Sequence, residues 1–192
     1  MAEVIFNLWL LFTSMFSGIA LLWDRQFGFL KETLVAPVPR IQVMIGRTLG
    51  GATVAMLQGC LVVVCLIAGF RPVHLATIPV GLLFLALIAT VFAALGTAIG
   101  SSLQDMQGFQ LVMNFLVLPI FFLSGALFPL QNLPKALAFV TSLDPLSYGV
   151  DGLRATLIGT SHFGILTDAV VLVGAAILLL CAGAWRFSRI EI

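Results

Sequence analysis

The sequence predicts an all-α integral membrane protein with about five transmembrane helices, and three observations lead to this class. Of the 192 residues, 61% are hydrophobic and only 9% are charged, whereas soluble domains carry about 25% charged residues. The apolar residues form long runs, and the charges gather between these runs. The net charge is only +1, and no basic, aromatic-rich patch is present, which argues against nucleic acid as a partner.

Five apolar runs are long enough to span a membrane, since about 20 apolar helical residues cross a bilayer core. Only Glu3 precedes the first run, so it lacks the basic start of a signal peptide and is interpreted as a retained span. A sixth run, 136–143, is too short to cross. The expected spans are residues 4–22, 49–70, 78–100, 109–128 and 168–185.

The basic residues predict which loops face the cytoplasm, because Lys and Arg are enriched on that side of a membrane. An odd number of spans places the loop after the first span and the tail after the fifth on one side. These two segments contain Arg25, Lys31, Arg40, Arg47, Arg186 and Arg189, and the opposite loops contain Arg71, Lys135 and Arg154. We therefore expect an outer N-terminus and a cytoplasmic C-terminus.

The expected cytoplasmic loop, 23–47, is a polar island in an otherwise apolar chain. Its residues 24–35 are predicted to form an amphipathic helix, because apolar side chains recur from Phe27 at helical spacing and Pro37 ends the pattern. Two interpretations stay open from these residues alone. The helix can lie on the membrane surface, or it can be a rigid lever that a cytoplasmic partner pushes.

The expected outer loop, 128–158, is the second unusual region. Two stretches, 135–143 and 147–158, look helical but are too short to span, so we expect re-entrant or capping helices. Asp151 and Arg154 stand three residues apart and can pair on a helix. The residues that mark this region are Pro129, Pro134, Pro145, Tyr148, Asp151 and Arg154.

The polar residues within the spans are amides and hydroxyls, and no ionisable side chain lies deep in any span, which argues against ions or protons as cargo. The GTAIG pattern of 96–100 predicts close helix packing without naming the partner helix. The cysteines show no metal-site spacing. Candidates for a substrate path, with inter-helix hydrogen bonding as the alternative, are Asn7, Gln58, Asn114 and Ser124.

The chain contains no nucleotide-binding loop and no convergent catalytic set, so it is not expected to be an enzyme. If the protein works actively, its energy must come from another chain.

Three blocks of sequence resemble the permease subunits of type-2 ABC exporters. This family includes daunorubicin-type drug exporters and the nodulation lipo-oligosaccharide exporter. The blocks are WDRQFGFLKE at 23–32 with LVAP at 34–37 and Arg40, FLSGALFP at 122–129 with Pro134, and DPLSY at 144–148 with Asp151 and Arg154. Their order and their places between the spans extend the resemblance over essentially the whole chain.

The resemblance implies six spans, an elbow helix before the first, two permeases per transporter and two cytoplasmic ATPase subunits. This chain begins on what resembles the family's second span, so we expect a single ABC-2 transmembrane domain that is truncated at its N-terminus. The loop 23–47 matches the family's coupling loop. The residues expected to contact the ATPase are Asp24, Arg25, Phe27, Phe29, Leu30, Lys31, Glu32 and Arg40.

The function that the resemblance implies is that of a permease subunit of an ATP-driven exporter in the bacterial inner membrane. It would work as a homodimer or heterodimer and move an amphipathic drug-like, lipid-linked or oligosaccharide substrate. The chain needs no cofactor of its own, because ATP and Mg bind to the partner ATPase. The alternatives are a non-transporting membrane scaffold or assembly subunit, and a secondary transporter.

Overall fold

The computed structural model describes residues 2–29, 38–69, 77–127, 135–157, 159 and 161–188, and within them it contains helices and no strand. The predicted all-α class is therefore confirmed. The helices are α1 (Ala2–Phe16), α2 (Ile19–Gln26), α4 (Arg40–Gly69), α5 (Ile78–Ser102), α6 (Met106–Leu123), α7 (Lys135–Leu143), α8 (Pro145–Leu157) and α9 (Ile165–Ser188).

Three described helices are long and apolar enough to cross a membrane, namely Ile78–Ser102, Met106–Leu123 and Ile165–Phe187. They coincide with the last three expected spans. The first expected span corresponds to α1 and α2 together, and the second lies within α4. The total of five spans stays a prediction.

The N-terminal end of α4 differs from the sequence prediction, since the helix begins at Arg40 rather than near residue 49. Arg40 and Arg47 therefore belong to a helix and not to a loop. The difference has a simple cause, because a hydropathy criterion finds the apolar middle of a helix and misses polar turns that extend beyond it.

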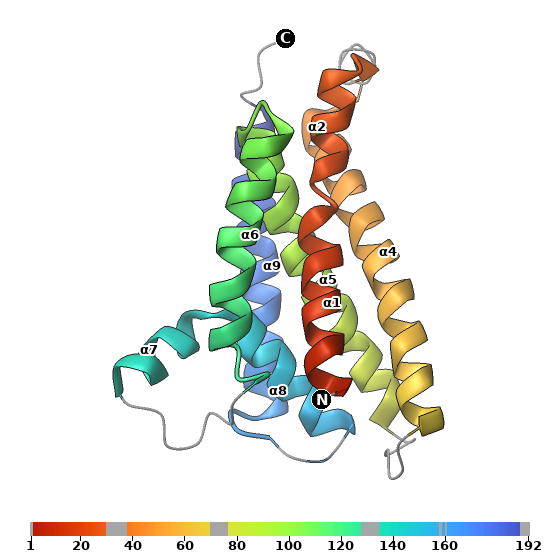
Figure 1. Cartoon of the computed structure of the whole chain (residues 1–192), viewed down its shortest axis with the longest axis vertical. Coiled ribbons are helices and arrows are strands. Elements are labelled where there is room, and N and C mark those ends of the chain that lie inside the picture. The colour runs from red at the N-terminus through yellow and green to blue at the C-terminus, as the bar shows by residue number, and fades with distance from the viewer. Residues whose placement is uncertain are drawn as a thin grey trace.

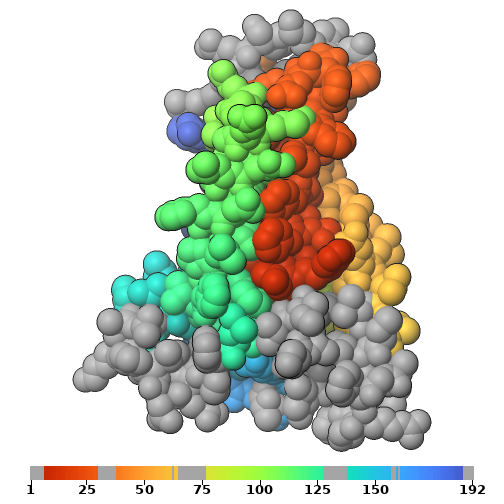
Figure 2. Space-filling model, viewed as in Figure 1, coloured from red at the N-terminus to blue at the C-terminus, as the bar shows by residue number. Residues whose placement is uncertain are grey.

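The helix α5 forms the centre of the bundle and contacts α1, α4, α8 and α9. It is apolar around its whole circumference, as expected for a helix with neighbours on every side, and Phe84, Ile88 and Phe92 are fully buried. The long helices run along the long axis in Figure 1, with α2 near one end and α7 and α8 near the other. The surface of α1 lies exposed between α6 and α4 (Figure 2).

The α1–α2 break at Ser17 and Gly18 packs directly against α5. A Cβ atom on Gly18 would lie 2.1 Å from the carbonyl oxygen of Gly96, and a Cβ on Gly96 would lie 2.1 Å from that of Met15. A Cβ on Gly100 would come within 2.7 Å of the Gly18 oxygen. Only glycine permits such an approach of two backbones. The partner of the Gly96–Gly100 pattern is therefore the α1–α2 break.

Hydroxyl groups connect α4 to α5 and to the α1–α2 break, next to the glycine contacts. The hydroxyl oxygens of Thr48 and Thr97 are buried and 2.9 Å apart, and the Thr97 hydroxyl also donates to the carbonyl of Ala93 at 2.9 Å. A Cβ on Gly51 of α4 would lie 2.4 Å from the hydroxyl oxygen of Ser17. Three segments thus meet through small side chains, a common way for membrane helices to pack. We call this set the small-residue junction: Ser17, Gly18, Thr48, Gly51, Gly96, Thr97 and Gly100.

Replacement of Gly96 tests the small-residue junction. We expect Gly96→Ala to lower the thermal stability of the detergent-solubilised protein, because the new methyl group meets a backbone carbonyl that cannot rotate away. Overpacking of this kind costs about 1–3 kcal/mol. The matched control is Gly50→Ala on α4, where a Cβ meets nothing within 4 Å and alanine is the better helix former. Equal melting temperatures for the two variants would contradict the close contact.

Candidate functional site

The last turn of α2 is bound to three neighbouring elements. Asp24 forms an ion pair with Arg47 of α4. Arg25 Nη1 donates a hydrogen bond to the carbonyl oxygen of Leu103, between α5 and α6, at 2.7 Å. The indole nitrogen of Trp23 donates to the sulfur of Met106 at 3.1 Å. A force applied to the end of α2 therefore reaches α4, α5 and α6 through short contacts.

The predicted helix over residues 24–35 is not continuous, because α2 ends at Gln26 and the chain turns at Phe27 and Gly28, while residues 30–35 lie outside the described residues. Gly28 has a φ of 82°, a left-handed conformation that glycine adopts without a steric penalty. Phe27 and Phe29 are 71% and 57% exposed. Phe27 lies in the turn and Phe29 is the helical residue that follows it, so two exposed apolar side chains flank Gly28.

The predicted ATPase-contacting residues therefore do not share one role. Asp24 and Arg25 are engaged in contacts within the chain, whereas Phe27 and Phe29 are exposed. Arg40 is the first residue of α4. Leu30, Lys31 and Glu32 lie outside the described residues.

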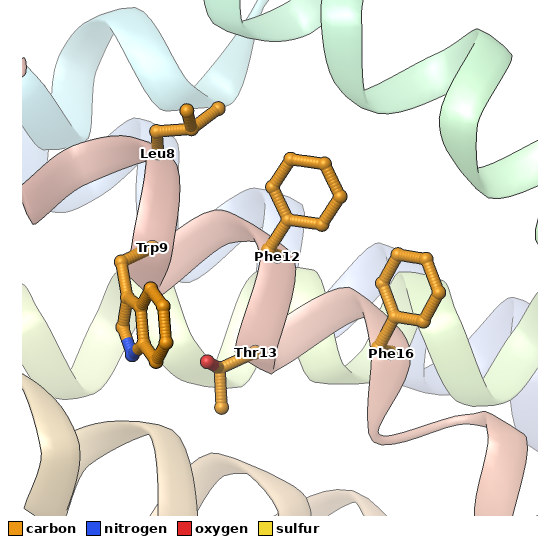
Figure 3. A pocket seen from close by; sticks show the side chains of 5 residues that line it. All are labelled: Leu8, Trp9, Phe12, Thr13 and Phe16. Carbon is orange, nitrogen blue, oxygen red and sulfur yellow. The ribbon is translucent and has the colours of Figure 1, made fainter. Parts of the chain in front are cut away.

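An open groove of about 430 Å³ runs along α1, and its walls are almost entirely apolar. In Figure 3, Phe12 and Phe16 lie toward α6, while Trp9 and Thr13 lie on the side of α4. The rings of Phe12 and Phe16 stack with centroids 5.6 Å apart, and Phe16 meets Phe109 of α6 edge-on. We call this feature the α1 groove, and it is lined by Leu8, Trp9, Phe12, Thr13 and Phe16.

Gln58 of α4 supplies the polar contact at one side of the α1 groove. Its side-chain oxygen accepts hydrogen bonds from the Thr13 hydroxyl at 2.9 Å and from the Trp9 indole nitrogen at 3.2 Å. One amide therefore fixes the positions of two side chains that line the groove. Inter-helix hydrogen bonding, the alternative considered for Gln58, is thus present, and it occurs at the groove.

The other three substrate-path candidates are not brought to the α1 groove. Asn7 is buried on the face of α1 that also buries Leu10 and Ser14, and its Oδ1 has no hydrogen-bond partner. Asn114 is exposed on α6. Ser124 is fully buried, and its hydroxyl donates to the carbonyl of Phe121 at 2.8 Å.

The helices expected between residues 128 and 158 are present as α7 and α8. Asp151 accepts hydrogen bonds from the backbone N–H groups of His162 and Phe163, each at 2.8 Å to Oδ2. Arg154 Nη1 donates to the carbonyl of Gly125 at 3.1 Å. The two side chains thus bind separate backbone segments, one before α9 and one after α6. Together they fix α8 between these helices.

Two other members of this region have defined places. Pro145 is the first residue of α8. The hydroxyl of Tyr148 donates to the carbonyl of Ser142 at 2.8 Å, which ties α8 to α7. Pro129 and Pro134 lie outside the described residues.

Besides Asp151, two further carboxyl groups near α8 are buried. Asp144 lies between α7 and α8, outside the candidate spans, and burial raises its pKa to about 7 although hydrogen bonds from Leu146 N–H and Ser147 act in the opposite direction. Asp168, in the first turn of α9, is fully buried, and neither of its oxygens has a hydrogen-bond partner. An ionisable side chain is therefore buried near one end of an apolar helix. Among the described residues, no cluster of carboxylate, His or Cys side chains could hold a metal ion.

Apolar helices of membrane-spanning length around a buried α5, with a groove along α1, define an α-helical integral membrane protein. The chain belongs to the ABC-2 type transporter family, whose family model matches residues 1–158. The resemblance seen in the three sequence blocks is thereby confirmed.

Individual relatives agree with this family. The chain is 32% identical over 143 residues to a protein named ycf38 from Pyropia yezoensis, covering 72% of this chain and 48% of that protein. It is 28% identical to Nodulation protein J of Rhizobium leguminosarum bv. viciae, covering 67% and 52%. It is also 28% identical to the inner membrane transport permease YadH of Escherichia coli (strain K12), covering 75% and 56%. The chain thus spans about half the length of these relatives.

Sequence reasoning missed most of the α1 groove. Its lining residues follow helical spacing, from Leu8 through Phe12 to Phe16, so the stripe itself was visible. The rest of α1 is equally apolar, however, and periodicity then gives no indication of which face lies open.

The titration of Asp144 gives a prediction for the junction between α7 and α8. Burial raises its folded-state pKa to about 7, above the ordinary value of about 3.9 for an aspartic acid, so folding favours the protonated acid. The contribution of this protonated carboxyl group to the free energy of unfolding is fully present below about pH 4. It is lost as the pH rises to about 7, by up to about 1.4 kcal/mol per pH unit. Asp144→Asn removes this titration and keeps an oxygen for the Leu146 N–H.

Melting temperatures of both proteins in detergent, measured across this range, test the point. The melting temperature of the Asp144→Asn protein should exceed that of the wild type by little in acid, and the difference should widen toward neutral pH. A gap that stays constant would show that burial of this carboxyl group is not what makes stability depend on pH.

Proposed function

We propose that this chain is the membrane-spanning permease subunit of an ATP-driven exporter, with its ATP hydrolysed by a separate ABC ATPase. The observation that carries this proposal is the α1 groove in a chain that belongs to the ABC-2 type transporter family. One relative is named an inner membrane transport permease. The sequence contains no nucleotide-binding loop of its own, so a transport cycle driven by ATP needs a partner that binds ATP and Mg.

The exposed side chains of Phe27, in the turn after α2, and Phe29 are the proposed contact for the ATPase. Exposed aromatic side chains that enter a pocket of a partner are typical anchors of protein interfaces. Behind this turn, Asp24 and Arg25 connect α2 to α4 and to the α5–α6 connection. In this proposal the phenylalanines receive the movement of the ATPase, and the polar residues transmit it into the bundle.

The α1 groove favours an amphipathic substrate. Its apolar walls suit an acyl chain or a drug-like ring system, and the Gln58 amide at one side can bind a hydroxyl or amide of the cargo. Ions need charged ligands along their path, and none of the described residues that line the groove is charged. We therefore propose drug-like, lipid-linked or acylated oligosaccharide cargo.

The proposed location is the bacterial inner membrane, with the Phe27 turn and the C-terminus in the cytoplasm and the N-terminus outside. Leu21, Met44 and Phe187 form one buried cluster, so the ends of α2 and α9 and the start of α4 lie together, as this topology requires. The positive-inside rule then assigns the basic end to the cytoplasm. Two permeases, identical or different, would form the transporter.

Substitution of Phe27 tests the ATPase contact. We expect Phe27→Asp to reduce co-purification with a co-expressed ABC ATPase by at least about tenfold, the effect of losing an apolar anchor worth about 2 kcal/mol. Membrane insertion should persist, because the side chain is exposed. Phe27→Leu should retain most binding. Gln107→Asp, at an exposed position on α6, is the control for added charge. Normal ATPase binding by the Phe27→Asp variant would contradict the docking assignment.

The substrate assignment is tested separately, in proteoliposomes that contain the permease and its ATPase. We expect an acylated oligosaccharide to stimulate ATP hydrolysis and the same oligosaccharide without its acyl chain not to do so. Gln58→Leu should weaken the stimulation several-fold without changing basal hydrolysis. Asn114→Leu, which removes an exposed amide outside the groove, should behave as the wild type. ATPase binding without any substrate stimulation would instead favour the scaffold alternative.

A further inference from the structure

A second groove, of about 290 Å³, lies between α6 and α9 over the last turns of α5. Its floor is formed by Ala98 and Ile99, and Ser102 lies near its end. Val112 of α6 forms one wall, and Ala182 and Arg186 of α9 form the other. The walls are apolar except near Ser102 and Arg186. The groove therefore has an amphipathic lining, with its charge at one end.

Small side chains and the position of α9 keep this groove open. Ala98 and Ala182 lack the volume to fill it. Gly183, the residue after Ala182, packs so closely that a Cβ would lie 1.9 Å from the methyl carbon of Met44 on α4 and 3.3 Å from the Cβ of Ala98 on α5. This packing holds α9 against α4 and α5 beside the groove.

The charged end of the groove lies at the level expected for lipid headgroups. Trp185 is 54% exposed beside Arg186, and Trp23, 51% exposed, contacts Met106 near the same end of the bundle. Tryptophan is enriched where the bilayer core meets the headgroups. The apolar part of the groove then extends from that level toward the bilayer core.

Arg186 is exposed, and no ion pair or hydrogen bond joins its guanidinium to the residues that the structure describes. Asp105, in the α5–α6 connection, accepts a hydrogen bond from the N–H of Gly108 at 2.6 Å as the cap of α6. The arginine is thus available to an anion. Guanidinium groups bind phosphate oxygens in pairs.

We propose that this groove binds an anionic phospholipid, with its phosphate on Arg186 and one acyl chain between α6 and α9. The charge decides between the two occupants that suit an apolar groove within a membrane. A neighbouring apolar helix would cover the guanidinium and remove it from water without supplying an anion, which is costly. A phospholipid supplies both the apolar chain and the negative charge.

Native mass spectrometry of the purified full chain tests the proposal. The probes are phosphatidylglycerol and phosphatidylcholine of identical acyl chains, added together in equal amounts. We expect retention of phosphatidylglycerol over phosphatidylcholine by the wild type. Arg186→Gln should reduce this preference by roughly fivefold, the effect of one basic residue near an anionic headgroup. Arg186→Lys should keep most of the preference.

A variant that fills the groove separates the acyl-chain contact from the charge. Ala182→Phe should lower the retention of phosphatidylglycerol although Arg186 is unchanged, and the matched control Val173→Phe, at an exposed position on α9 outside the groove, should not. Unchanged retention in both Arg186→Gln and Ala182→Phe would overturn the site. Should Arg186→Gln fail to fold, the Ala182→Phe and Val173→Phe pair still decides the question.

The competing occupant is tested by cross-linking in membranes. With the native cysteines replaced by serine, Ala182→Cys should give no disulfide between two copies if a lipid occupies the groove. Efficient formation of cross-linked dimers would show that a helix of a second copy lies there and would overturn the lipid assignment.

Discussion

The close backbone contact between the α1–α2 break and α5 is the constraint on which the other features depend. Helices in a bilayer gain little from burying apolar surface against one another, so their association depends on how closely their backbones can approach. Gly18 and Gly96 bring two backbones together where any side chain would collide. The contact fixes the course of α1 along α5 and of α2 beyond the break. It thereby places both the α1 groove and the Phe27 turn.

The two candidate functional features consequently belong to one continuous segment. The residues that line the α1 groove end at Phe16, the break follows at once, and α2 ends in the exposed turn. The contacts of Asp24 and Arg25 keep that turn joined to α4 and to the α5–α6 connection. The turn and the groove are thus joined by a short stretch of chain, with the small-residue junction between the two.

Hydropathy alone predicted α5, α6 and α9 to within about five residues, because a bilayer requires long apolar helices. The prolines around it and its short apolar run predicted α7. The pattern at Gly96 and Gly100 predicted close packing but not its partner. The helix expected from Asp24 is interrupted at Phe27 and Gly28, because Gly28 adopts a left-handed conformation that apolar periodicity does not reveal. Asp151 was considered as a helix-surface ion pair, whereas it accepts N–H groups of the α8–α9 connection, a relation that only the tertiary fold reveals.

The reciprocal glycine contact also restricts how this bundle can change shape. Sliding α1 by one residue, about 1.5 Å, would bring a neighbouring Cβ against a carbonyl of α5. The two helices therefore move as one rigid body. Within the described chain, α6 has the looser attachment to α5, and Pro119 interrupts its hydrogen-bond ladder. A bend of α6 would thus move Phe109 relative to Phe16 at one end of the α1 groove, while α1 itself stays in register with α5.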